Sequence, residues 1–133
     1  MRTPTCSWGR ALAISEFSKD GELLFDATLP PENRSYRAFR FPWRGRPSDR
    51  PACVAERTSE EEVRLYASWN GATEVASWEV LSGPRAGRVK SLGSVPREGF
   101  ETAMVVRTSE AYVAVRAKDR SGGVLGTSGP VET

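Results

Sequence analysis

The chain has 133 residues, of which 38% are hydrophobic and 27% charged, a composition typical of one globular domain with or without a structured appendage. A chain of this length buries roughly two-thirds of its unfolded surface, which is enough for one real core. The formal net charge of +2 is too small to favour nucleic acid or an anionic membrane surface as a partner. No apolar run approaches the ~20 residues that span a bilayer, so no membrane span is expected.

The sequence contains no histidine. Histidine is the usual general base near neutral pH and the commonest metal ligand, and the Ser–His and Cys–His nucleophile pairs depend on it. The acidic run Glu60–Glu62 lacks the glycine turn and the 12-residue loop of a calcium site, so we interpret it as solvated charge. We therefore predict no catalytic residue, no cofactor and no metal site in this chain.

Two features bear on the cellular compartment. Residues 11–14 form the only apolar patch near the N-terminus, whereas a secretory signal needs roughly 7–15 apolar residues. The sequence as written thus shows no export signal, and the localisation stays open. Cys6 and Cys53 lie far apart and outside any CxxC motif, so we expect two separate small apolar side chains. A disulfide between them would require an exported parent protein.

The first structural element that the sequence predicts is a β-hairpin over about residues 12–30. Ile14–Phe17 alternates weakly, Asp20-Gly21 supplies a turn with positive φ, and Glu22–Leu29 is typical of a second strand. Pro30 and Pro31 end it. We assign residues 1–33 to this hairpin and expect it to be the least stable part of the chain, because an isolated hairpin is marginal.

An aromatic and arginine-rich bridging segment follows at residues 34–52. Phe39, Phe41 and Trp43 recur with period two, which places them on one face. Aromatic rings beside arginines could stack bases and hold phosphates, but 17 acidic residues nearly balance the 19 basic ones. We therefore predict that the three aromatic side chains pack between the hairpin and the domain that follows.

From Cys53 onward the pattern predicts a β-sandwich over residues 53–133. Apolar and polar residues alternate between turns rich in Gly, Pro and Asn, with no credible helix. Strands are expected at 63–69, 75–81, 89–95, 100–107, 112–117 and 124–131. Trp69, Trp78 and Tyr112 could form a ligand platform, but we interpret them as structural aromatic residues of the sandwich core.

This region resembles a fibronectin type III domain. The similarity lies in Trp69 and Trp78 on successive strands, in the alternation that follows Tyr112, and in the Ser-Gly-Pro sequence that begins at Ser128. The resemblance implies that a tryptophan packs in the core. It also implies that Tyr112 forms a tyrosine corner, in which its hydroxyl hydrogen-bonds back to the backbone.

Several longer strings resemble the C-terminal end of arylsulfotransferase-like proteins. They are SYRAFRFPW (Ser35–Trp43), LYASWNGATEVASWEVL (Leu65–Leu81), GFETAMVVRTSEAYVAV (Gly99–Val115) and LGTSGPV (Leu125–Val131). SEFSKDGELLFDATLP (Ser15–Pro30) is similar to the last outer strands of that family's β-propeller. The resemblance implies a parent propeller that transfers a sulfuryl group between phenols without a nucleotide donor, through histidines that have no counterpart here.

The function predicted from these resemblances is that of a non-catalytic C-terminal module of an arylsulfotransferase-like protein. Its partner would be a propeller domain or another protein chain, and no nucleic acid. Two alternatives remain. The chain could be a free-standing β-sandwich that binds a partner, or a truncated gene product without a selected function.

Overall fold

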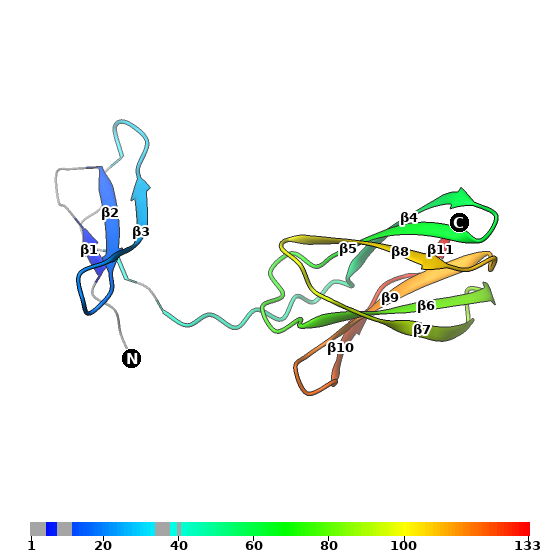
Figure 1. The fold of residues 1–133 in the computed structure, drawn as a ribbon. Coiled ribbons are helices and arrows are strands. Elements are labelled where there is room, and N and C mark those ends of the chain that lie inside the picture. Colours follow the sequence, from blue (N-terminus) through cyan, green and yellow to red (C-terminus); the bar gives the residue numbers. More distant parts are fainter. Residues whose placement is uncertain (1–4, 8–11, 34–37, 40) are drawn as a thin grey trace. The chain divides into compact units, whose positions relative to one another are not determined.

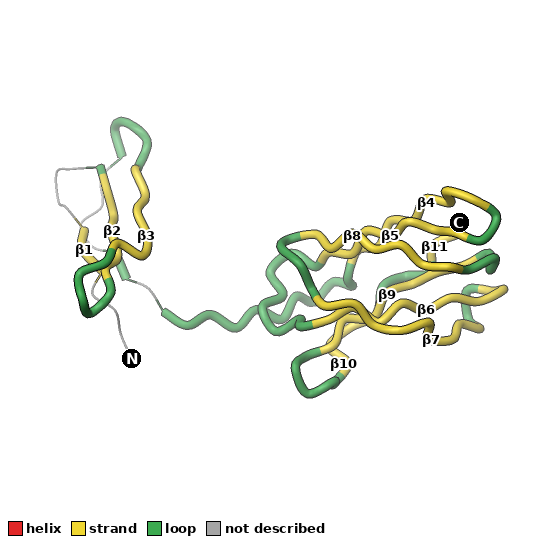
Figure 2. The backbone as a smooth tube through the Cα atoms, viewed as in Figure 1, coloured by secondary structure: helices red, strands yellow, loops and turns green. Residues whose placement is uncertain are grey.

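The computed structural model describes residues 5–7, 12–33, 38–39 and 41–133 (Figure 1). Every regular element among these residues is a β-strand, so the predicted mainly-β class is confirmed (Figure 2). The described residues contain no helix of the length and apolar character needed to cross a membrane. The chain divides into two compact units, Met1–Pro42 and Trp43–Thr133. The boundary between them falls within the predicted bridging segment, residues 34–52.

The N-terminal unit is a three-stranded antiparallel sheet. Its strands are β1 (Thr5–Ser7), β2 (Ala13–Phe17) and β3 (Leu23–Thr28), and β2 lies in the middle. The predicted hairpin is confirmed as the β2–β3 pair. Its turn is closed by Ser18, whose hydroxyl accepts hydrogen bonds from the backbone N–H groups of Asp20 (3.2 Å) and Glu22 (3.0 Å). The sequence did not predict β1, because three residues are too few to show a periodicity.

The described side chains of this sheet bury little apolar surface. The large apolar side chains of β3 are exposed, at 58% for Leu23, 52% for Leu24 and 53% for Phe25. The buried side chains of β2 are polar, and the Ser15 hydroxyl donates to Asp26 Oδ1 at 2.6 Å. Because a sheet of this size needs an apolar face to be stable by itself, low stability of residues 1–30 stays our prediction.

The second unit contains two facing antiparallel sheets (Figure 1). The first sheet has the order β4-β5-β8, formed by β4 (Ala52–Ser59), β5 (Glu62–Ser68) and β8 (Glu101–Arg107). The second has the order β10-β9-β6-β7, formed by β6 (Ser77–Arg85), β7 (Arg88–Pro96), β9 (Tyr112–Lys118) and β10 (Val124–Thr127). A short β11 (Val131–Glu132) also pairs with β9. This is a β-sandwich, as predicted.

The core lies between the two sheets and follows the predicted alternation. Every second residue of the central strands points inward, because successive side chains of a strand point to opposite faces. The largest fully buried apolar side chains are Trp78, Leu65, Val63, Val80, Val113 and Val115. The indole N–H of Trp78 donates to Thr102 Oγ1 at 3.2 Å, so the one polar atom of this ring is satisfied inside the core.

Two strand predictions need correction. The strand expected at 124–131 is interrupted at Ser128, whose hydroxyl accepts from the Val115 N–H at 3.0 Å and so replaces a regular ladder position. The strand expected to end before Ser82-Gly83-Pro84 continues as β6 to Arg85. A register shift between Ser82 and Arg85 accommodates the proline, which cannot donate to the ladder.

Candidate functional site

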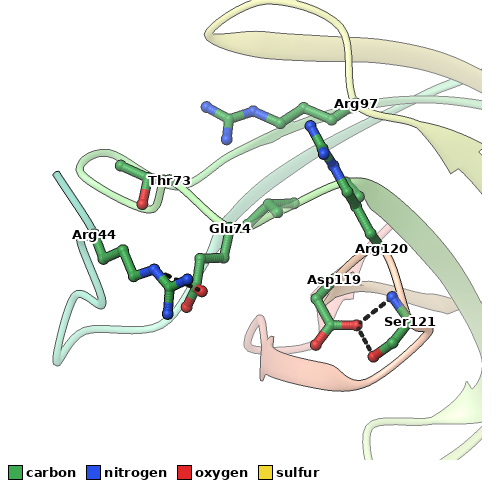
Figure 3. A pocket seen from close by; sticks show the side chains of 9 residues that line it. Arg44, Thr73, Glu74, Arg97, Asp119, Arg120 and Ser121 are labelled. Carbon is green, nitrogen blue, oxygen red and sulfur yellow. Dashed lines mark hydrogen bonds and ion pairs between the residues drawn. The ribbon is translucent and has the colours of Figure 1, made fainter. Parts of the chain in front are cut away.

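One end of the sandwich is hollowed by a pocket of about 600 Å³ (Figure 3). The loop between β5 and β6 and the loop between β9 and β10 form two of its walls. The β7–β8 connection and the segment that precedes β4 complete it. The charged and hydroxyl side chains that line it are those of Arg44, Thr73, Glu74, Arg97, Asp119, Arg120 and Ser121.

The segment before β4 reaches the pocket because Gly45 anchors it to the β5–β6 loop. The Gly45 N–H donates to Thr73 Oγ1 at 2.9 Å, and the Thr73 N–H donates to the Gly45 carbonyl at 3.3 Å. Next to this anchor, Arg46 Nε lies 2.7 Å from Glu74 Oε2. Residues 41–51 of the bridging segment therefore form no strand, but they have fixed contacts that place Arg44 on the pocket wall.

Replacing Gly45 by alanine is expected to release this anchor. A Cβ at this position would collide with the Gly71 carbonyl oxygen, whereas a Cβ at Gly87, in the exposed β6–β7 turn, would meet nothing within 4 Å. In ¹⁵N NMR spectra, Gly45→Ala should shift the amide signals of Thr73 and Glu74, while Gly87→Ala leaves them in place. Unchanged signals in Gly45→Ala would contradict the anchor.

Both carboxylates of the pocket already have partners. Glu74 is held by Arg46, and Arg44 Nε lies 3.9 Å from its other oxygen. Asp119 Oδ1 accepts from the Ser121 hydroxyl (2.6 Å) and from the backbone N–H groups of Ser121 and Gly123 (2.8 Å each). These donors, the Ser121 hydroxyl first, hold the pKa of Asp119 below its usual range.

Two arginines of the pocket have no carboxylate partner among the described residues. Arg97 is half-buried and fixed by backbone carbonyls: Nη1 donates to Ala72 at 2.9 Å and Nε to Gly99 at 3.3 Å. Arg120 is exposed. Figure 3 shows both guanidinium groups on the upper side of the pocket, away from the Asp119–Ser121 contact.

The arrangement is suited to binding and shows no catalytic constellation. Its hydroxyl groups, on Thr73 and Ser121, have no histidine beside them, because the sequence has none. In the part of the chain that the structure describes, no group of three or more Cys, Asp or Glu side chains could hold a metal ion. What the pocket offers a ligand is guanidinium N–H groups.

Packing of the bridging aromatic residues between the two units stays a prediction. Neither unit by itself covers these rings: Phe39, Phe41 and Trp43 are 68%, 65% and 77% exposed, and the centroids of Phe39 and Phe41 lie 6.1 Å apart. Among the described residues of this segment, those before β4 form no strand, so no sheet of their own lies behind these rings.

The other predicted aromatic residues belong to the sandwich. Trp69 and Trp78 are buried, as expected for core residues. Gly126 packs so closely on the Trp69 ring that a Cβ there would lie 2.7 Å from Cη2. Tyr112 begins β9 and is half-buried, but its hydroxyl makes no hydrogen bond to the described residues, so the implied tyrosine corner is not observed. The connection before β9 is fixed instead by Thr108, whose hydroxyl forms a hydrogen bond with the Ser82 hydroxyl at 2.7 Å.

Cys53 is a free thiol on the partly buried side of β4. Burial raises its pKa to about 11, against the opposing effect of a hydrogen bond from Ser128. Relative to an ordinary thiol, Cys53 should hold roughly a hundredfold less thiolate at pH 8, and the thiolate is the reactive form. We therefore expect iodoacetamide to alkylate Cys53 roughly a hundredfold more slowly in the native protein than in urea. Mass spectrometry of the Cys53 peptide measures the two rates. Equal rates would contradict burial of the thiol.

No protein-family model matches the chain, no curated protein matches its sequence, and no solved structure matches its fold. The functional proposal therefore depends on the geometry of the sandwich and its pocket.

Proposed function

We propose that this chain is a non-catalytic binding module built on an immunoglobulin- or fibronectin-like sandwich. Strand order is the observation that supports it. If β4 to β10 are lettered A, B, C, C′, E, F and G, sheet A-B-E faces sheet C′-C-F-G. In variable immunoglobulin domains the B–C and F–G loops belong to the recognition surface. Here the same two loops, after β5 and after β9, line the pocket.

The binding role is tested by an NMR screen of the whole ¹⁵N-labelled chain against a fragment library of anions, cations and neutral molecules. Hits should shift the amides of residues 73–76 and 119–123 more than those of residues 85–88, at the β6–β7 turn. A library that yields no hit at the pocket end would overturn the binding role.

The non-catalytic part of the proposal has its own test. The purified chain, incubated with an aryl sulfate donor and a phenol acceptor, should release no more phenol than buffer does. The reason is that no histidine is present to carry the sulfuryl group in the way the arylsulfotransferase resemblance implies. Turnover proportional to protein concentration would overturn it.

A second candidate function is that of the C-terminal module of an arylsulfotransferase-like protein, in which the N-terminal sheet completes a propeller blade. The observation that favours it is the exposure of the large apolar side chains of β3, Leu23, Leu24 and Phe25, which neighbouring strands of a blade would cover in part. Mass spectrometry of the native protein tests it. Histidine-containing propeller peptides in the same polypeptide would support this role, and a native start at Met1 would overturn it.

A further inference from the structure

The pocket at the loop end of the sandwich carries unbalanced positive charge. Four guanidinium groups lie on or beside it, at Arg44, Arg46, Arg97 and Arg120, against the two carboxylates of Glu74 and Asp119. Glu74 is already held by Arg46. Asp119 is occupied by its own turn. The charge left over for a ligand is therefore positive.

Among the pocket arginines without a carboxylate partner, Arg97 is the one whose side chain is held in place by hydrogen bonds. Hydrogen bonds to the carbonyls of Ala72 and Gly99 use Nη1 and Nε. A guanidinium has five N–H groups in a fixed fork, so the two that Arg97 uses in this way leave three for a ligand. Because the side chain is already ordered by these bonds, a ligand would lose less conformational entropy in engaging it than in ordering a free arginine.

Arg120 offers a second guanidinium from another connection, the β9–β10 turn. It lies in the β9–β10 turn that Asp119 organises through its bonds to Ser121 and Gly123. The turn thus has a fixed backbone, while the Arg120 side chain makes no hydrogen bond or ion pair with the described residues. A carboxylate or a phosphate can accept two parallel N–H bonds from a guanidinium group.

We propose that this pocket binds the oxyanion group of a small ligand, a carboxylate or a phosphate, between Arg97 and Arg120, with Arg44 at the rim. The proposal rests on the binding role proposed above and names its ligand class. A cation is disfavoured because both carboxylates are already engaged and the free charges would repel it. The pocket's volume of about 600 Å³ leaves room for an organic body attached to that group.

The test is a ¹⁵N NMR titration of the full chain at low ionic strength with four probes: citrate, inorganic phosphate, glucose and ethylenediamine. Citrate or phosphate should shift the amides of 73–76, 97 and 119–123 to saturation, and the stronger of the two identifies the oxyanion. Glucose and ethylenediamine should not. Affinity should fall as salt rises.

The variant Arg120→Ala should weaken binding about tenfold or more, because it removes a charge-assisted contact. It should leave the melting temperature unchanged, since Arg120 supports nothing else among the described residues. Arg88→Ala is the matched control, because it removes the same charge from an exposed arginine where β7 begins, after the β6–β7 turn. Arg120→Lys should recover part of the affinity, since it restores charge without the fork.

The outcomes separate the two proposals. Equal weakening by Arg120→Ala and Arg88→Ala would mean a net-charge effect and would overturn the oxyanion site. Saturable binding of glucose or ethylenediamine here, without anion binding, would overturn the ligand class but leave the binding role standing. If neither the four probes nor the fragment library shifts the amide signals of the pocket loops, both proposals are overturned.

Discussion

Trp78→Ala is expected to lower the free energy of unfolding of the sandwich by about 3–5 kcal/mol, the usual range for removal of a buried tryptophan. Trp78 is 1% exposed and is the largest fully buried side chain among the described residues. Its removal leaves a cavity between the sheets, which close packing elsewhere prevents from collapsing. It also removes a donor from Thr102 Oγ1.

Urea unfolding, followed by far-UV circular dichroism and by hydrogen exchange of the Val115 amide in β9, measures this loss. Trp78→Phe is the informative second variant, because it keeps an aromatic ring in the core and removes the indole N–H. It should cost less than Trp78→Ala. A midpoint for Trp78→Ala within error of the unaltered protein would show that Trp78 is not the centre of the core.

The core could be predicted from sequence because its signal is local. Val63, Leu65 and Ala67 alternate with polar residues over a single strand, and the structure buries all three. Burial of one face of a strand imposes period two directly on the sequence. The same argument located β9, where Val113 and Val115 are fully buried. It did not predict β4, whose apolar residues are only partly covered.

The pocket could not be predicted in this way, because its residues come from separate connections. Arg44, Glu74, Arg97 and Arg120 lie on four segments that only the strand order brings to one end of the sandwich. No periodicity links them, and each arginine alone is typical of a solvated surface. The sequence indicated only that turns separate the strands predicted at 63–69 and 75–81, and at 112–117 and 124–131. The sequence does not show which loops lie at the same end of the sandwich.

Period two is an incomplete signal where no sheet lies behind the strand. Phe39, Phe41 and Trp43 show as clean an alternation as β5, yet neither unit by itself covers them. Alternation says that side chains share a face, and burial requires a second layer to cover that face. The three prolines of the segment from Pro42 to Pro51 remove backbone donors, which disfavours the strand pairing that would have supplied a sheet.

Arg57→Ala is expected to destabilise the sandwich by about 2 kcal/mol, from the loss of charge-assisted hydrogen bonds to carbonyls that have few other donors. The guanidinium of Arg57 joins three parts of the fold. It donates to the carbonyl of Glu60 in the β4–β5 turn at 3.0 Å, and to those of Thr108 and Glu110 before β9 at 3.1 and 2.8 Å. It also donates to Thr133 Oγ1 at 2.6 Å.

Thermal unfolding and amide hydrogen exchange measure this effect, and exchange should accelerate most between residues 108 and 112. Arg64→Ala is the matched control, an exposed arginine on the neighbouring strand, and should stay within about 0.5 kcal/mol of the unaltered protein. Arg57→Lys should recover less than half of the loss, because an ammonium cannot span three carbonyls as a planar fork can.

Equal stability of Arg57→Ala and Arg64→Ala would contradict this role. Full rescue by lysine would mean that charge alone suffices. The expected result would show that Arg57, with Thr108, holds the turn before β9 that the fibronectin resemblance had assigned to Tyr112.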